Sequence, residues 1–460
     1  MTAQPLRRMR LLRRSGLAAT LMLALTLSAA DANGKRGAPK RDPLRIPNSS
    51  VELTVWDNIE GWTEDSHSDA LGTFLTSCRA IQRGPKSART GRPVLSALFG
   101  ICERAVAALP LEDAAARTFF EKNFRPVQIA PLGEREGFFT GYYEPVVEGA
   151  RLPSDVYTVP LYRRPSDFLV SRLRHSKSKR GKFGKRVAKR SAPYYDRTQI
   201  EDGVIAGREL EICYLKDPID AFFAQIQGSV RVRLEDGSII RLNYDAQNGH
   251  PYTAVGKFLI ERKIYTREEI TMQKIREWME ANPEDARSLR RENKSYVFFR
   301  ETDLAPQDEP PGAQGVALTP GRSIAVDRNL HTYGMLFFID AQLPIVSEKP
   351  DTAFRRLMVA QDTGGAIVGP ARADIYLGAG DEAARAAGRF KHNGRFIMLV
   401  PNELDPDRLA RDIPLPLPRP NIDPPTKLAQ VQQAERESVP APVAAGNPVP
   451  LPKARPARKK

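Results

Sequence analysis

The sequence predicts a mainly β protein with helices, of the α+β class, and three observations indicate this. Apolar residues recur at helical spacing in residues 69–123. Residues 230–243 read as two strands around Asp236-Gly237, a pair typical of a hairpin turn. After residue 296, short strand-like runs alternate with glycine-rich turns, which is typical of a small β-barrel. At 460 residues the chain is long enough for two ordinary domains.

The first 32 residues have the features of an export signal. Five arginines between positions 7 and 14 precede an apolar stretch at 16–30, and Ala30-Asp31-Ala32 fits a cleavage site. We therefore expect an exported protein with no integral membrane segment once the signal is removed, with an uncleaved anchor as the alternative. The signal contains no cysteine that could carry a lipid. Residues 33–49 predict a flexible lead-in.

The remaining elements follow in chain order. Three amphipathic helices are expected in residues 69–123, followed by a strand at 138–145 that Pro145 ends. Another strand is expected at 156–162, and helices are expected at 217–227, 256–262, 266–281 and 284–292. The short strands of the last part are expected at 296–300, 325–326, 335–339, 356–359, 373–376 and 395–400.

The net charge of +15 is concentrated in three segments. Residues 1–32, 163–190 and 413–460 contribute +4, +11 and +5, which leaves −5 for the rest. An acidic body behind an export signal argues against a nucleic-acid binder. We expect 163–190 to be a solvated basic loop and 413–460, which holds 12 of the 38 prolines, to be a disordered tail. Both segments could attach to an anionic wall or membrane, or could serve only as a solubilising surface.

Cysteine and histidine are scarce. Cys78 and Cys102 would form a disulfide in an oxidising compartment and leave Cys213 unpaired, and three buried free thiols are an equal alternative. The sequence has no Cys-x-x-Cys pair and no His-Glu-x-x-His motif. It therefore predicts no metal site and no cofactor.

Three aspartates lie in surroundings that suit chemistry. Asp362 precedes Gly364-Gly365, Asp374 lies in an apolar strand, and Asp327 follows the run at 323–326. Glycines let the backbone approach a ligand closely. Partial burial would raise the pKa of a carboxyl group, as a general acid at neutral pH requires. Each aspartate taken alone could instead cap a turn beside the glycines, so the interpretation depends on the three together.

Residues 324–378 resemble the three-aspartate domain, with Asp327, Asp362 and Asp374 at the named positions. With the strand at 138–145 and the region 210–257, the chain resembles the membrane-bound lytic transglycosylase A family over about residues 50–402. The resemblance implies a double-psi β-barrel built from 50–146 and 294–402. It also implies a smaller β-rich domain inserted at 147–293, with a groove between the two. The missing lipid-anchor cysteine departs from the family name, so we expect a periplasmic protein associated with the wall or outer membrane by other means.

The resemblance also implies an activity. A lytic exotransglycosylase cuts peptidoglycan strands between N-acetylmuramic acid and N-acetylglucosamine and leaves a 1,6-anhydro end. Asp374 would be the general acid and then the base, Asp362 would support it, and Asp327 would be structural. The residues themselves do not distinguish attack at strand ends from attack in strand interiors.

The same resemblance implies a set of groove residues. Contacts to the glycan are expected from Thr140, Tyr142, Tyr143, Gly364, Gly365 and Tyr376. Because neighbouring strand residues face opposite sides, one of Tyr142 and Tyr143 is expected in the groove and the other in the core. Two alternatives remain: a wall-binding protein without catalysis, and a hydrolytic muramidase that uses Glu144 as a second carboxylate.

Overall fold

The structure is a computed structural model that describes residues 46–404, except for residues 111, 171–182, 188–189, 193 and 346–351. The expected signal, most of the lead-in, the tail at 413–460 and much of the basic loop lie outside the described residues. No helix in the part of the chain that is described is long and apolar enough to cross a membrane.

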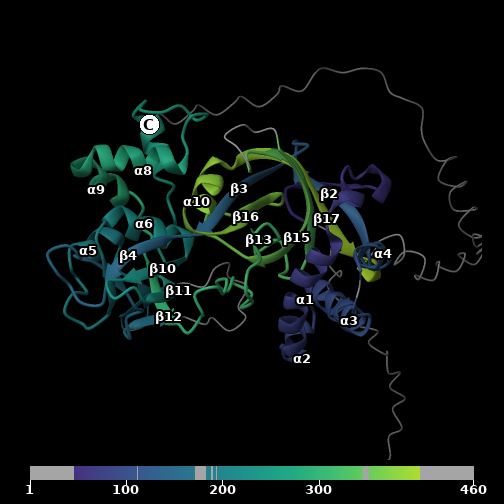
Figure 1. Ribbon diagram of the computed structural model, residues 1–460, viewed down its shortest axis with the longest axis horizontal. Coiled ribbons are helices and arrows are strands. Elements are labelled where there is room, and N and C mark those ends of the chain that lie inside the picture. The colour runs from purple at the N-terminus through teal and green to yellow at the C-terminus, as the bar shows by residue number, and fades with distance from the viewer. Residues whose placement is uncertain are drawn as a thin grey trace, which may run out of the picture. The chain divides into compact units, whose positions relative to one another are not determined.

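Six strands close into a barrel (Figure 1). Their order is β17-β14-β15-β13-β16-β3, and β3 pairs again with β17 to complete the ring. β13 runs parallel to β15 and β16 runs parallel to β3, whereas the other neighbours are antiparallel. The barrel strands are β3 (Gly137–Glu144), β13 (Ser323–Val326), β14 (Leu336–Leu343), β15 (Thr352–Asp362), β16 (Arg372–Ala379) and β17 (Lys391–Pro401).

Aromatic side chains fill the barrel. Phe337 stacks on Phe396 with ring centroids 4.6 Å apart, and Phe139 packs edge-on against Phe396 at 5.6 Å. All three are fully buried. Phe338 points the other way and contacts Trp62 of the helical layer, which identifies the face of Phe337 as the interior. Burial of each ring stabilises the barrel by about 1.5–3 kcal/mol.

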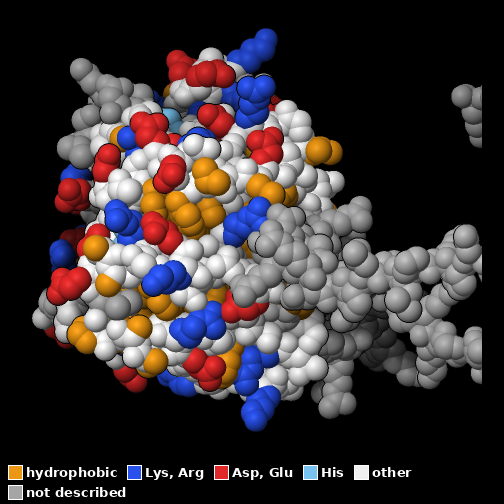
Figure 2. Space-filling view, turned by 90° about the vertical axis from the view of Figure 1, so that its right-hand side faces the viewer, with side chains coloured by type: hydrophobic (Ala, Val, Ile, Leu, Met, Phe, Trp, Pro, Cys, Tyr) orange, Lys and Arg blue, Asp and Glu red, His pale blue; other side chains and the backbone are white. Residues whose placement is uncertain are grey.

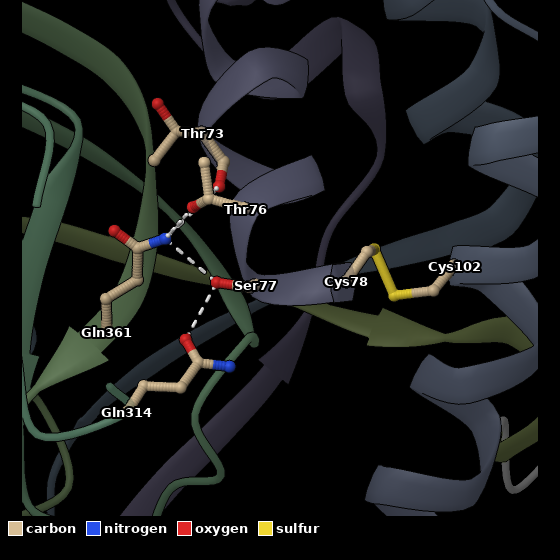
Figure 3. Close-up of a disulfide and its surroundings, with 7 residues drawn as sticks. All are labelled: Thr73, Thr76, Ser77, Cys78, Cys102, Gln314 and Gln361. Atoms are coloured by element: carbon tan, nitrogen blue, oxygen red, sulfur yellow. Dashed lines mark hydrogen bonds between the residues drawn. A yellow bond between two sulfur atoms is a disulfide. The ribbon is translucent and has the colours of Figure 1, made fainter. Parts of the chain in front are cut away.

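A helical layer and two further strands extend the barrel. β1 (Ser49–Leu53) pairs with β2 (Phe124–Pro131), which pairs with β17. The layer contains α1 (His67–Arg83), α2 (Lys86–Arg89), α3 (Pro93–Ala107) and α4 (Asp113–Asn123), and α10 (Gly380–Arg389) contacts β3 and β16. A disulfide joins Cys78 of α1 to Cys102 of α3 (Figure 3), which decides between the two states of these cysteines and leaves Cys213 free and buried. The remaining short turns of helix are η1 (Trp56–Asn58), η2 (Trp62–Glu64) and η3 (Asn402–Leu404).

The inserted segment forms a second sheet of six strands in the order β12-β11-β10-β4-β9-β5. The strands are β4 (Val146–Ala150), β5 (Val159–Tyr162), β9 (Glu211–Leu215), β10 (Ser229–Leu234), β11 (Ile239–Gln247) and β12 (Val297–Thr302). Its helices are α5 (Arg197–Glu201), α6 (Pro218–Gln227), α7 (Gly256–Glu261), α8 (Met272–Ala281) and α9 (Pro283–Arg291). α6 packs on this sheet and contacts α8, so the insert has a core of its own.

Both passages of the chain between barrel and insert meet at Glu144. Glu144 ends β3, is fully buried, and accepts hydrogen bonds from Arg231 Nε at 2.7 Å and Arg241 Nη2 at 2.9 Å. The same two arginines donate to carbonyls of the returning linker, namely those of Ala305, Pro306 and Asp308. One buried ionic cluster therefore ties the outgoing and returning chain together.

The α+β class, the barrel and the inserted β-rich domain are confirmed, as are the hairpin (β10 and β11) and the start of α9 at Pro283. Four expectations need correction. The lead-in ends earlier than 49, because Ser49 begins β1. β12 pairs with β11, so the insert ends after Thr302 and not at 293. The helix at 266–281 begins only at Met272. The basic loop contains paired strands, β6 (Phe168–Val170), β7 (Phe183–Val187) and β8 (Arg190–Ala192).

Candidate functional site

Three adjacent barrel strands bring Asp374, Asp362 and Thr140 to one region. Asp374 of β16 is opposite Thr140 of β3 on one side and opposite Ala325 of β13 on the other. Ala325 is in turn opposite Asp362 at the end of β15. The alternation along β3 and β16 directs Thr140 and Asp374 away from the barrel interior, where Phe139 packs. The sequence-predicted acid and its supporting aspartate therefore flank one central strand.

Asp374 is half-buried and has one hydrogen-bond donor among the described side chains. Thr140 Oγ1 donates to Asp374 Oδ1 at 2.6 Å, and Arg372 Nη2 donates to Thr140 Oγ1 at 2.7 Å. Burial raises the pKa of Asp374, while the positive charge of Arg372 and the Thr140 hydrogen bond oppose that increase. A carboxyl group with a raised pKa can hold a proton closer to neutral pH, as a general acid must.

Asp362 is held more tightly than Asp374. Its Oδ1 accepts from the backbone N–H groups of Ala313 at 2.9 Å and Thr363 at 2.8 Å, and its Oδ2 accepts from the Tyr142 hydroxyl at 2.9 Å. Burial raises the pKa of Asp362, these three donors lower it, and the negative charge of Asp374 raises it. This carboxylate is fixed in place by its donors, which suits a supporting role.

The residue before Asp362 anchors the end of β15 to the helical layer (Figure 3). Gln361 is fully buried, and its Nε2 donates to Thr76 Oγ1, Ser77 Oγ and the carbonyl oxygen of Thr73 on α1. α1 is itself joined to α3 by the disulfide at Cys78. The network therefore transmits the rigidity of the helical layer to the strand end that carries Asp362.

The two tyrosines expected at the groove are both largely buried: Tyr142 is 9% exposed and Tyr143 is 7% exposed. They do face opposite sides: Tyr142 packs on Tyr376 and bonds Asp362, whereas Tyr143 packs on Ala383 and Ala387 of α10. Tyr376 is fully buried and donates to Glu309 Oε2 at 2.6 Å. Its ring packs on that of Tyr142, which in turn is bonded to Asp362.

Gly364 and Gly365 are exposed, in a turn that leaves the backbone open. A Cβ atom added at Gly365 would lie 3.5 Å from Tyr252 Cβ, which belongs to the inserted domain. Burial raises the pKa of Tyr252 to about 12; the positive charge of Arg197 opposes this increase, and the negative charge of Asp374 adds to it. The site therefore includes a residue of the insert that the sequence analysis missed.

Arg372 was also missed, because an arginine two residues before the aspartate has no signal of its own in the sequence. Asp327 is buried at the end of β13, and its carboxylate accepts from the N–H groups of Asn329 at 2.9 Å and Gly369 at 3.1 Å. These contacts close the turn that precedes β16 and support the structural role expected for Asp327.

One cavity in the described part of the chain lies away from this site. It has a volume of about 750 Å³ and is lined by η2, the start of α1 and the first half of β15, including Asp65, Arg322 and Arg356. No cluster of three or more histidine, cysteine, aspartate or glutamate side chains suited to a metal ion is found in the described part of the chain.

Residues 138–300 match the MltA specific insert domain, and residues 322–400 match the 3D domain. The chain is 32% identical over 276 residues to the membrane-bound lytic murein transglycosylase A of Vibrio cholerae, an alignment that covers 58% of this chain and 68% of that protein. The chain belongs to the MltA family of lytic murein transglycosylases. It is likewise 33% identical over 264 residues to the Escherichia coli K12 enzyme of the same name, covering 57% of this chain and 65% of that one.

Solved structures of the MltA family agree with this assignment. The membrane-bound lytic murein transglycosylase of Agrobacterium tumefaciens superposes with a TM-score of 0.67 at 33% identity, covering 78% of this chain and 98% of that one. MltA from Neisseria gonorrhoeae superposes with a TM-score of 0.62 at 29% identity, covering 78% of this chain and 94% of that one. E. coli MltA with bound chitohexaose superposes with a TM-score of 0.55 at 25% identity, covering 78% of this chain and 93% of that one. The MltA fold therefore extends over nearly the whole described chain.

Proposed function

We propose that this MltA-family protein cleaves the β-1,4 bond between N-acetylmuramic acid and N-acetylglucosamine in peptidoglycan, with Asp374 as its acid and base. The observation that carries the proposal is the half-buried Asp374, whose pKa is raised by burial and whose Oδ1 is held by Thr140. The glycan bound to E. coli MltA supports a sugar polymer as the ligand class.

In the proposed reaction Asp374 donates one proton to the substrate and then accepts one from it. Protonated Asp374 gives its proton to the glycosidic oxygen as the bond from C1 of the muramic sugar breaks. The 6-hydroxyl of the same sugar attacks C1 and forms the 1,6-anhydro ring, and its proton returns to the Asp374 carboxylate. The nucleophile belongs to the substrate, so its effective concentration is high and no water has to be positioned.

The arrangement of the other carboxylates supports a single acting acid. Asp362 and Asp374 lie on strands that flank β13, so their backbones are separated by two strand spacings, about 10 Å. A glycosidase with two carboxylates uses the second one as a nucleophile or as a base for water. Both oxygens of Asp362 already accept hydrogen bonds, from the N–H groups of Ala313 and Thr363 and from the Tyr142 hydroxyl. Glu144 is fully buried and both its oxygens accept hydrogen bonds from arginine. This argues against the hydrolytic muramidase in which Glu144 activates water.

Several features support action in an oxidising compartment outside the cytoplasm. The Cys78–Cys102 disulfide is typical of exported proteins, and the relatives are named membrane-bound. On the face shown in Figure 2, lysine and arginine side chains are mixed with aspartate and glutamate, without the single-signed stripe of a nucleic-acid binder. We place the enzyme in the periplasm, at the wall or outer membrane.

The decisive experiment digests purified sacculi with the wild-type protein and with Asp374→Asn, and analyses the released muropeptides by mass spectrometry. Wild-type protein should release anhydro-muramic products, which are one water lighter than hydrolysed ends. Asp374→Asn should release none while still binding the glycan. Early release of disaccharide units indicates attack at strand ends, as we propose, whereas early shortening of long strands indicates attack in the interior. Hydrolysed ends, or turnover by Asp374→Asn, would overturn the proposal.

A further inference from the structure

Arg372 makes four contacts with residues around the site. Its Nη1 donates to the carbonyl oxygen of Ala373 at 2.5 Å and approaches that of Phe138 at 3.5 Å, while its Nη2 donates to Thr140 Oγ1 at 2.7 Å. The guanidinium carbon lies 5.1 Å from the centroid of the Phe138 ring. Arg372 is also next to Phe138 in the register of β16 and β3. These contacts fix the orientation of the guanidinium group.

The hydrogen bonds through Thr140 can run in only one direction. A guanidinium group has donors and no acceptor, so Thr140 Oγ1 must accept from Arg372. The single hydroxyl proton of Thr140 is then directed to Asp374 Oδ1, 2.6 Å away. Oδ1 is thereby occupied as an acceptor. Among the residues that the structure describes, none donates to the other oxygen, Oδ2.

We propose that Arg372 is a positioning residue that acts through Thr140 to keep the transferable proton of Asp374 on Oδ2. The inference rests on the proposed role of Asp374. In the acid step the Oδ2 proton goes to the glycosidic oxygen, and in the base step Oδ2 takes the proton of the 6-hydroxyl. Oδ1 keeps the Thr140 hydrogen bond throughout, so the same oxygen gives up and recovers the proton without rotation of the carboxyl group.

The other charged and titratable groups around Asp374 are either acidic or bonded elsewhere. Asp362 and Tyr142 face it from β15 and β3, and Tyr252 faces it from the insert, and each is influenced by the Asp374 charge. Lys391 of β17 is opposite Thr140, but its ammonium group donates to the carbonyl oxygens of residues 267, 268 and 270. Arg372 is the one positive charge that acts on Asp374 among the described residues.

Removal of Arg372 has a defined effect on the pH profile. Its charge and the Thr140 hydrogen bond favour the carboxylate form, so the pKa of Asp374 should rise in Arg372→Gln. The general acid must start protonated, and activity is lost on the alkaline side as Asp374 ionises. The alkaline limb of kcat/KM should therefore move to higher pH, while kcat falls about 10- to 100-fold because the proton is no longer held on Oδ2. KM should stay near the wild-type value.

The experiment measures kcat, KM and their pH profiles on purified peptidoglycan glycan strands for wild type, Arg372→Gln, Arg372→Lys, Thr140→Val and the Thr140→Val/Arg372→Gln double variant. Arg372→Lys keeps the positive charge but lacks the planar guanidinium group with its two fixed donors. It should therefore restore the pH of the alkaline limb of kcat/KM more fully than it restores kcat. In the Thr140→Val background, Arg372→Gln should lower kcat little further, because the chain of hydrogen bonds from Arg372 through Thr140 to Asp374 is already broken. Arg395→Gln, which alters an arginine of β17 bonded to Gln128 and Asn58, is the matched control.

The outcomes separate this inference from the proposed function. Turnover by Asp374→Asn would overturn the proposed function itself. An inactive Asp374→Asn, with Arg372→Gln unchanged in kcat and in the alkaline limb, would overturn only the role of Arg372. Fully additive losses in the double variant would likewise show that Arg372 does not act through Thr140. If Arg372→Gln does not fold, Thr140→Val alone tests the hydrogen-bond chain to Asp374, and it must move the alkaline limb of kcat/KM to higher pH.

Discussion

Glu144→Gln should destabilise the protein far more than its conservative chemistry suggests. The substitution preserves the size of a side chain that is fully buried between Arg231 and Arg241. It removes the negative charge and replaces one acceptor oxygen with an N–H donor. Because Arg241 Nη2 lies 3.1 Å and 2.9 Å from the two carboxylate oxygens, at least one of these contacts becomes donor against donor.

The size of the effect follows from burial. The Arg241 side chain is 1% exposed, and no other carboxylate forms an ion pair with it in the described structure. Arg231 is 14% exposed and retains Glu309 at 3.6 Å. One arginine is therefore left as an uncompensated buried charge, which costs about 3–5 kcal/mol. With a urea dependence near 3 kcal/mol/M, the unfolding midpoint should fall by roughly 1–1.7 M.

Urea unfolding followed by circular dichroism and tryptophan fluorescence measures this shift. Glu148→Gln is the matched control, because Glu148 lies on the next strand and forms an exposed ion pair with Lys216 at 2.5 Å. Its midpoint should stay at the wild-type value, since exposed pairs contribute little. If Glu144→Gln also unfolds at the wild-type midpoint, the buried cluster does not hold the two domains together.

Two further predictions concern the frame of the barrel. Reduction of the Cys78–Cys102 disulfide, or its replacement by two serines, should lower the free energy of unfolding by about 3–4 kcal/mol, because the bond closes a loop with a sequence separation of 24; equal thermal unfolding with and without reductant would contradict this. Gly394→Ala should cost about 1–3 kcal/mol, since the new Cβ would lie 2.6 Å from the carbonyl oxygen of Asp340 and from the Ala341 Cβ. Gly72→Ala on α1 meets nothing within 4 Å and should be neutral or stabilising by up to about 1 kcal/mol, so similar unfolding curves for the two variants would refute the packing argument.

Much of the fold could be predicted from sequence periodicity, because periodicity reports which face of an element is buried. The hairpin around Asp236-Gly237 and the helix at Pro283 have strong local signals and are present. β1 and β2 were missed, since each depends on a partner strand that is distant in the chain: β2 pairs with β17, more than 260 residues away. α10 was missed because its buried face consists of alanines and a glycine, without a large apolar side chain to mark it.

The site was predictable only where residue type is tied to chemistry. Asp374 and Asp362 stood out as carboxylates beside glycines and strands, and the structure brings them to either side of Ala325. Arg372 and Tyr252 did not stand out, because their roles depend on the register of β16 on β3 and on the placement of the insert. The burial of the Tyr376 ring in a cluster with Leu318 and Ile367 was likewise not visible in the sequence motif.

The junction at Glu144 has a consequence for how such chains can diversify. The insert departs from the barrel directly after Glu144 and returns through residues 303–309, and both passages are held by Arg231 and Arg241. An inserted module whose two ends are fastened at one point can be lengthened, trimmed or exchanged without rethreading the barrel strands. Chimeras that swap the segment between these ends should therefore tolerate wide variation, provided that Glu144, Arg231 and Arg241 are transferred as a set.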